Sequence, residues 1–150
     1  MAEQKYVVFR LDKEFYGMPI ESVERILPDQ KVTKLPRTPK MFLGIFELRG
    51  ATIPVIDARL RFEMEELADA KNLIVVLTDQ GRCAIRVDSV DGIMNLADEN
   101  IDENPQIVDQ RGDDFVRGIG KSEDKLTVLL DPHRIVPKQL RSQVAKANAA

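Results

Sequence analysis

Few residues in this chain have the type and spacing that catalysis requires. The sequence contains one histidine, His133, and one cysteine, Cys83. Zinc sites usually take three or four protein ligands, mostly histidine and cysteine, so a lone histidine predicts no metal centre. We interpret His133 as a surface or helix-capping residue and Cys83, which alternates with Ile85 and Val87, as a packed strand residue. A Cys–His nucleophile pair needs both side chains in one pocket, and no pattern here places them together.

Two other patterns resemble chemical motifs incompletely. Residues 118–122 read Gly-Ile-Gly-Lys-Ser, like the end of a phosphate-binding loop. The full motif requires a glycine where Phe115 stands and a helix afterwards, whereas residues 126–130 have the composition of a strand. We therefore expect a hairpin turn. The acidic pairs at 98–99 and 113–114 lie in polar stretches, and we interpret them as solvated rather than as acid–base pairs. The sequence predicts no enzyme, no cofactor and no metal site.

Arg49 is the residue that best fits interaction chemistry. It lies in Leu48-Arg49-Gly50, between two strongly apolar segments. Arginine presents a planar fork of five donors and is enriched among the residues that dominate binding energy at protein interfaces. We expect Arg49 to share a strand face with Glu47, so that the two side chains order one another. A solvated turn arginine is the alternative interpretation.

The elements that position these residues occur in two similar halves. Residues 16–26 (YGMPIESVERI) and 83–93 (CAIRVDSVDGI) share their apolar positions, an acidic-Ser-Val-acidic centre and a closing isoleucine. A second pair, 44–57 and 118–131, begins with Gly-Ile and ends with Asp in both copies. Similarity at a fixed offset indicates a duplicated supersecondary unit. Two units are too few for a solenoid, so we expect one body made of two related halves.

Short apolar segments separated by Gly, Pro and Asp predict a fold built mainly from strands, as a pair of small barrels or a sandwich. Asp57 and Asp131 have the type and position of helix N-caps. The expected strands are 6–11, 15–19, 32–35, 44–48, 52–56, 73–77, 83–87, 93–96, 115–120 and 126–130, and the expected short helices are 20–27, 58–62 and 132–136.

We expect a single domain over 1–150 with two subdomains. The first covers 12–72, and the second covers 73–137 together with the first strand, 6–11, which crosses over to complete it. The acidic stretch 63–71 is the best candidate for a linker. Residues 138–150 are rich in Lys, Gln, Ser and Ala and are expected to form a helical or frayed tail with little role in the core.

Composition excludes several classes of partner. The chain has 150 residues and a net charge of -3, which offers no basic surface for nucleic acid. Its longest apolar runs are far shorter than the ~20 residues that span a bilayer, so no direct membrane insertion is expected. A single cysteine fits a reducing cytosol. We expect a cytoplasmic protein.

Two long segments resemble a known family. Residues 42–50 (FLGIFELRG) and 53–59 (IPVIDAR), together with Tyr16-Gly17, Ser22-Val23 and 87–90, resemble the signature of CheW-like chemotaxis coupling proteins. The resemblance extends from about residue 6 to residue 136. It implies a mainly all-β fold of two SH3-like five-stranded β-barrels, agreeing with the duplication. It also implies a non-enzymatic adaptor without cofactors.

The partners implied by the resemblance are the regulatory domain of a chemotaxis histidine kinase and the cytoplasmic tip of methyl-accepting chemoreceptors. The protein would be recruited to membrane-associated receptor arrays and would control kinase activity there. Two alternatives stay open. One is an adaptor for a different chemosensory pathway, such as surface motility or second-messenger signalling. The other is a small-ligand binding module that uses the seam between the barrels.

The resemblance also implies two binding surfaces. The kinase-facing residues are Val23, Arg25 and Gly44, and the receptor-facing residues are Arg49, Val90 and Ile93. For the four that are apolar or glycine, core packing or turn geometry is an equally good explanation. Two positions depart from the family pattern: Glu47 stands where asparagine is usual, and Arg25 stands where acidic, Lys or Ser residues are frequent. Arg25 predicts a compensating acid on the partner.

Overall fold

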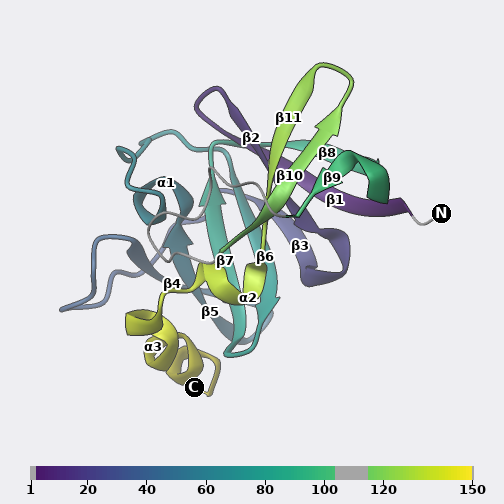
Figure 1. The fold of residues 1–150 in the computed structure, drawn as a ribbon. Coiled ribbons are helices and arrows are strands. Elements are labelled where there is room, and N and C mark those ends of the chain that lie inside the picture. The colour runs from purple at the N-terminus through teal and green to yellow at the C-terminus, as the bar shows by residue number, and fades with distance from the viewer. Residues whose placement is uncertain (1–2, 104–114, 150) are drawn as a thin grey trace.

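The computed structural model describes residues 3–103 and 115–149, which form two β-sheets, short helices and one longer C-terminal helix (Figure 1). The acidic pair at 113–114 lies outside the described residues. The strands are β1 (Glu3–Leu11), β2 (Glu14–Pro19), β3 (Val23–Pro28), β4 (Phe42–Leu48), β5 (Ala51–Asp57), β6 (Asn72–Thr78), β7 (Gly81–Val87), β8 (Ser89–Ala97), β9 (Ile101–Asp102), β10 (Val116–Ser122) and β11 (Lys125–Leu130). The helices are the 3₁₀ turns η1 (Ile20–Ser22) and η2 (Asp98–Asn100) and the α-helices α1 (Ala58–Arg61), α2 (Pro132–Ile135) and α3 (Lys138–Ala149).

The two sheets exchange strands between the two halves of the chain. One sheet has the order β8-β1-β2-β11-β10-β9, and the other has the order β3-β6-β7-β5-β4. The β1–β2 hairpin of the first half is therefore completed by β8, β10 and β11 of the second, and β6–β7 is completed by β3, β4 and β5. The parallel pairs β2–β11 and β5–β7 join the hairpins within each sheet.

This pairing differs from the predicted division at 12–72 and 73–137. The expected crossover of the first strand is present, since β1 pairs with β8. However, β2 lies in the same sheet as β1, and β6 and β7 lie in the sheet of the first half's strands. The chain leaves its sheet through η1 after β2 and at Asp88 after β7. Periodicity within a strand carries no information about which sheet it joins, so the sequence could not reveal this exchange.

The central core lies between the two sheets, and each sheet also encloses a smaller cluster. Strand β6 serves both: Ile74 and Val76 belong to the central cluster, whereas Leu73 and Val75 belong to the cluster of the five-stranded sheet. A strand buried on both faces appears in sequence as a continuous apolar run, as residues 73–77 do. The third cluster is small and consists of Tyr6, Leu96 and Leu129.

Two local predictions are wrong. Residues 20–27 were expected to be helical, but only Ile20–Ser22 forms a 3₁₀ turn and the rest is β3, which pairs with β6. The apolar spacing there suits either structure, and cross-strand burial against β6 decides for the strand. The expected strand at 32–35 is reduced to an isolated bridge from Thr33 to Ile45. The predicted hairpin of β10 and β11 is confirmed.

The duplication recurs in the backbone and capping hydrogen bonds. The Asp57 side chain accepts from the N–H of Arg59, and the Asp131 side chain accepts from the N–H of His133, each at 3.0 Å. Both predicted N-caps are therefore confirmed, and Pro132 occupies the first turn of the second helix. Equivalent sequence positions thus have equivalent structural roles in the two halves.

The C-terminal tail does contribute to the core, contrary to the prediction for 138–150. Helix α3 packs against β5 and β7 (Figure 1), and Leu140 and Val144 are fully buried in the central cluster. The Asn148 carboxamide accepts from the N–H of Arg82 and donates to its carbonyl oxygen, both at 2.9 Å. Two apolar residues four apart in an otherwise polar helix were the available signal, because this spacing puts them on one face.

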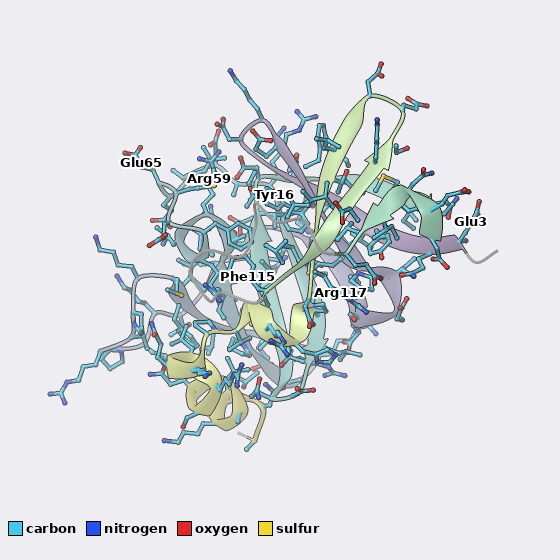
Figure 2. The ribbon with its side chains drawn as sticks, in the orientation of Figure 1. Glu3, Tyr16, Arg59, Glu65, Phe115 and Arg117 are labelled. Atoms are coloured by element: carbon cyan, nitrogen blue, oxygen red, sulfur yellow. The ribbon has the colours of Figure 1, made fainter. Side chains whose placement is uncertain are left out.

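A row of aromatic rings links the sheets to the helices. Phe9 stacks on Tyr16 with ring centroids 5.6 Å apart, Tyr16 contacts Phe62 at 5.3 Å, and Phe62 stacks on Phe115 at 4.9 Å. Tyr16 and Phe115 lie in the middle of the molecule (Figure 2). The guanidinium of Arg61 lies over the Phe115 ring at 4.5 Å. These ring contacts connect Phe115, the residue before β10, to the β1–β2 hairpin.

Candidate protein interaction surface

The residues with catalytic potential are separate from one another and lie in ordinary surroundings. Cys83 is fully buried in β7, and burial raises the pKa of its thiol to about 12. His133 is exposed on α2, where its Nδ1 lies 3.1 Å from Oδ1 of Asp79. Within residues 3–103 and 115–149, no group of three or more His, Cys, Asp or Glu side chains could hold a metal ion. None of the described helices has the length and apolar character needed to cross a membrane.

Strands β3 and β8 are equivalent in the repeat, and within the described ranges 3–103 and 115–149 each lies at the edge of its sheet with one hydrogen-bonded neighbour. Val23 on β3 and Val90 on β8 are half-buried against the central cluster. Beyond them, Ile26 and Ile93 are 42% and 61% exposed. Large apolar side chains beside open strand edges are a typical setting for a partner. We call β3 and β8 with these four side chains the edge surface.

Ile26 is a candidate binding residue that the sequence reasoning missed. The signal was present, because Ile26 closes the first repeat where Ile93 closes the second. The sequence pattern instead placed Ile26 in an expected short helix at 20–27. Once that segment is a strand paired with β6, Ile26 stands opposite Ile74 at the open edge of the sheet and remains partly in solvent.

Arg25 is a half-buried cation on β3. Its neighbour Glu24 pairs with Arg82 on β7, with Oε1 and Nε 2.8 Å apart. In the part of the chain that the structure describes, no salt bridge involves Arg25. Its guanidinium is therefore available for an acidic group on a partner.

Gly44 does not lie with Val23 and Arg25 on one edge. It is buried on β4, at the opposite end of the sheet order from β3. Its φ is +147°, and a Cβ at this position would meet the carbonyl oxygen of Thr33 at 2.2 Å. The absence of a side chain lets Thr33 form two backbone hydrogen bonds with Ile45, of 2.8 and 2.9 Å. Gly44 therefore shapes this edge and offers no side chain to a partner.

Beside this bridge is a groove of about 870 Å³. Its walls come from residues 29–43, residues 60–66 and Arg86. The apolar lining consists of Val32, Pro39, Phe42, Leu43, Leu60 and Met64, and the charged lining consists of Asp29, Lys34, Lys40, Glu65, Glu66 and Arg86. A lining that combines apolar side chains with charges of both signs suits a protein segment as well as a small molecule.

Arg86 anchors the charged side of the groove, with 9% of its side chain exposed. Its Nε lies 3.2 Å from Oδ1 of Asp29, and its Nη1 lies 3.8 Å from Oδ2 of Asp57. It also donates to the carbonyl oxygens of Leu67 and Ala68 at 2.8 and 2.9 Å. Burial raises the pKa of Asp57, although the Arg59 N–H and the Arg86 charge act in the opposite direction.

Arg49 is exposed in the two-residue turn between β4 and β5, so the expectation that it shares a strand face with Glu47 is wrong. Arg49 and Gly50 both have positive φ, of 51° and 84°. Two-residue hairpin loops favour this conformation because it matches the twist of the strands. A non-glycine residue there carries local strain and directs its side chain into solvent rather than along the strand.

A half-buried ion pair between Arg59 and Asp88 holds the junction between β7 and β8. Asp88 accepts from Nε of Arg59 at 2.7 Å and from the N–H of Asp12 at 2.7 Å. Burial raises the pKa of Asp88, but these hydrogen bonds together with the positive charges of Arg59 and Arg86 outweigh burial, and the net shift is downward. Nη1 of Arg59 also donates to the carbonyl oxygen of Glu65 at 3.3 Å, and both residues lie at the same end of the molecule (Figure 2).

Comparison with known proteins supports an interaction role. The family model described as CheW-like domain matches residues 5–140. The chain is 27% identical over 150 residues to a protein named chemotaxis protein CheW from Klebsiella aerogenes, covering 97% of this chain and 90% of the relative. It is 28% identical over 137 residues to the protein of the same name from Helicobacter pylori, covering 89% and 82%.

A solved structure has the same fold. The crystal structure of the scaffolding protein TtCheW from Thermoanaerobacter tengcongensis matches with a TM-score of 0.83 and 31% sequence identity, covering 91% of this chain and 94% of that one. That fold consists of two SH3-like β subdomains, which confirms the predicted fold class. The six-stranded sheet found here comprises five full strands and the two-residue β9.

Proposed function

Since the chain belongs to the CheW-like family, whose members are non-enzymatic scaffold proteins of chemotaxis, we propose that it binds a sensor histidine kinase and membrane chemoreceptors at the same time. It does so in the cytoplasm, recruited to receptor arrays. The observation that carries this proposal is the edge surface: two equivalent sheet edges, one in each sheet, both flanked by exposed isoleucine. One chain thereby offers two related docking edges.

The receptor tip binds on the β8 side of this surface. Ile93 is the exposed large apolar side chain of β8, and Val90 packs against the central cluster below this strand. A receptor tip is a helical hairpin, and an apolar stripe on a helix matches a row of exposed branched side chains. Ile26 is the equivalent exposed isoleucine on β3. Arg49 contributes a guanidinium from the strained β4–β5 turn.

The regulatory domain of the kinase binds β3 and the groove beside β4. Val23 and Arg25 lie on β3, and Gly44 maintains the hydrogen bonds between Thr33 and Ile45, next to the groove residues Val32, Lys34 and Leu43. Arg25 pairs with a carboxylate of the kinase, because it has exposed surface and the described part of the chain provides no salt bridge for it. The charge at this position selects the partner.

Control of the kinase follows from differential binding. A scaffold changes the activity of a kinase only when it binds one conformation of that kinase more tightly than another. Simultaneous attachment to receptors raises the effective concentration of each partner, so weak single contacts become a stable array.

Affinity capture from the native cell lysate tests the receptor assignment. The baits are the wild-type protein, Arg49→Glu and the control Arg37→Glu, which makes the same charge change at another exposed arginine with positive φ. We expect the wild type and Arg37→Glu to capture an identified histidine kinase and an identified chemoreceptor, and Arg49→Glu to lose the receptor alone. If the folded wild type captures neither, the adaptor function is refuted.

Arg25→Glu tests the kinase assignment. We expect at least a tenfold weaker affinity for the captured kinase's regulatory domain, measured by calorimetry, with the melting temperature unchanged. Introducing a lysine for the partner's acidic residue should restore binding to this variant. Unchanged affinity of Arg25→Glu would remove β3 from the kinase surface.

A further inference from the structure

The side chain of Asn72 connects the two strands of the edge surface. Asn72 is half-buried at the start of β6. Its Nδ2 donates to the carbonyl oxygen of Leu27 on β3, and its Oδ1 accepts from the N–H of Val90 on β8, each at 3.2 Å. A single carboxamide therefore joins an edge strand of one sheet to an edge strand of the other.

The backbone of Lys71 makes the same connection. The N–H of Asp29, just after β3, donates to the Lys71 carbonyl oxygen at 2.8 Å. The N–H of Lys71 donates to the carbonyl oxygen of Asp88, just before β8, at 2.9 Å. We call Lys71 and Asn72 with these four hydrogen bonds the bridge. It runs from the end of β3 to the start of β8.

The β8 end of the bridge lies at an irregularity in its strand. Along β1 the partners change from Val8 with Gly92 to Phe9 with Val90, which leaves Asp91 as an extra residue on β8. A bulge bends a strand and weakens its ladder locally. The position of Val90 thus depends on Asn72 more than it would in a regular strand.

The repeat provides no second bridge. The first half has Lys5 at the position that Asn72 occupies in the second, since Lys5 pairs with Asn95 where Asn72 pairs with Pro28. A lysine side chain has donors but no acceptor, so it cannot receive an N–H from one strand while donating to another. The connection between the two edges is therefore specific to the β6 side.

We propose that Asn72 is a positioning residue that couples the two docking edges, so that receptor binding on β8 changes the affinity of the kinase for β3. This inference rests on the proposed function. A partner that moves Val90 changes the length of its hydrogen bond to Asn72, and Asn72 passes this displacement to Leu27. The coupling is reciprocal, because a linkage free energy acts equally in both directions.

The test uses Asn72→Leu, which has similar size but neither donor nor acceptor, and Asn72→Asp, which keeps the acceptor for Val90 and loses the donor for Leu27. The control is Asn148→Leu, which removes three hydrogen bonds of another carboxamide, far from the bridge in sequence. The measurement is the affinity for the kinase regulatory domain with and without a saturating fragment of the receptor tip. Coupling of this kind typically changes affinity about 5–150-fold.

We expect the wild type and Asn148→Leu to show the same affinity ratio, and both Asn72 variants to show a ratio closer to one, with only the Lys71 backbone bonds intact, while still binding each partner. The inference is wrong if Asn72→Leu keeps the wild-type ratio, if Asn148→Leu loses it equally, or if the wild type binds both partners without coupling. If Asn72→Leu does not fold, Asn72→Asp decides in its place. Binding of neither partner by the wild type refutes the proposed function instead.

A readout without partners separates the two proposals. Ile93→Ala perturbs β8, and NMR reports the backbone shifts of Leu27, whose carbonyl oxygen accepts from Asn72. We expect these shifts to change in the wild-type background and to stay unchanged in the Asn72→Leu background. Equal changes in both backgrounds would exclude transmission through Asn72.

Discussion

Replacing Gly44 by alanine tests how the β4 edge is built. At φ of +147°, a side chain brings backbone strain of about 1–3 kcal/mol. The new Cβ also meets the Thr33 carbonyl oxygen at 2.2 Å, the Thr33 carbonyl carbon at 2.8 Å and the Lys34 Cα at 3.1 Å. All three atoms belong to the backbone, so relief requires that the 33–34 segment move away from β4.

That movement breaks both hydrogen bonds between Thr33 and Ile45. Each contributes about 1 kcal/mol, so the two hydrogen bonds between Thr33 and Ile45 account for about 2 kcal/mol in addition to the strain. Gly44→Ala should therefore lower the free energy of unfolding by about 3–5 kcal/mol. Gly92→Ala is the matched control, because Gly92 has φ of +134° but open space around its Cβ. This control should lose only the strain of about 1–3 kcal/mol.

Urea unfolding of the two variants measures the difference. With a typical m-value of about 2 kcal/mol/M, the midpoint of Gly44→Ala should lie about 1 M below that of Gly92→Ala. Hydrogen exchange at the Ile45 amide should also accelerate in Gly44→Ala alone. Equal midpoints, or a lower midpoint for Gly92→Ala, would refute the argument that Gly44 is required by its close approach to Thr33.

Leu140→Ala should lower the free energy of unfolding by about 2–5 kcal/mol, because the side chain is fully buried, and a change within 0.5 kcal/mol in calorimetry would contradict a core role for α3. Because the pKa of Asp57 is raised in the folded protein, the contribution of Asp57 to the free energy of unfolding falls as pH rises from the ordinary aspartate pKa toward the raised one. Asp57→Asn, which keeps the helix cap, should remove this decline from a series of urea unfolding curves measured at increasing pH from the ordinary aspartate pKa upward; a decline that persists in this variant would belong to another group. The lowered pKa of Asp88 has the opposite effect. Its contribution to the free energy of unfolding is complete above the ordinary aspartate pKa and is lost as pH falls below that pKa, so Asp88→Asn should reduce the loss of stability at acidic pH. The Cys83 thiol should react with a disulfide reagent at pH 8 only after the protein unfolds, since burial raises its pKa to about 12, and rapid labelling of the native protein would overturn this.

The candidate surfaces could be predicted only in part. Short-range patterns identified the strands around Gly44, Arg49 and Val90, and the resemblance assigned Gly44 to the kinase-facing surface and the other two residues to the receptor-facing surface. Only the structure shows that Gly44 is buried at one sheet edge and that Arg49 stands in a turn. Ile26 was missed, because its exposure depends on which strand lies beside β3. Exposure is a property of neighbours that are distant in sequence.

The sequence by itself determined the duplication, the two N-caps and most of the strands. These features depend on residues that are close together in the chain. In each N-cap a carboxylate accepts a hydrogen bond from the N–H two residues later, and in the strands apolar side chains alternate along one segment. Such interactions form in the same way wherever the segment lies in the fold. Asp57 and Asp131 were therefore identified correctly from their immediate neighbours alone.

Only the tertiary structure decided which hairpin joins which sheet, that α3 completes the core, and that Asn72 lies between β3 and β8. These outcomes depend on burying apolar surface between segments far apart in the chain, and several pairings satisfy the same local pattern. Leu140 and Val144 have the same spacing whether the helix is docked or free. The free energy that selects the docked arrangement comes from the shared core, and that core exists only after both halves have come together.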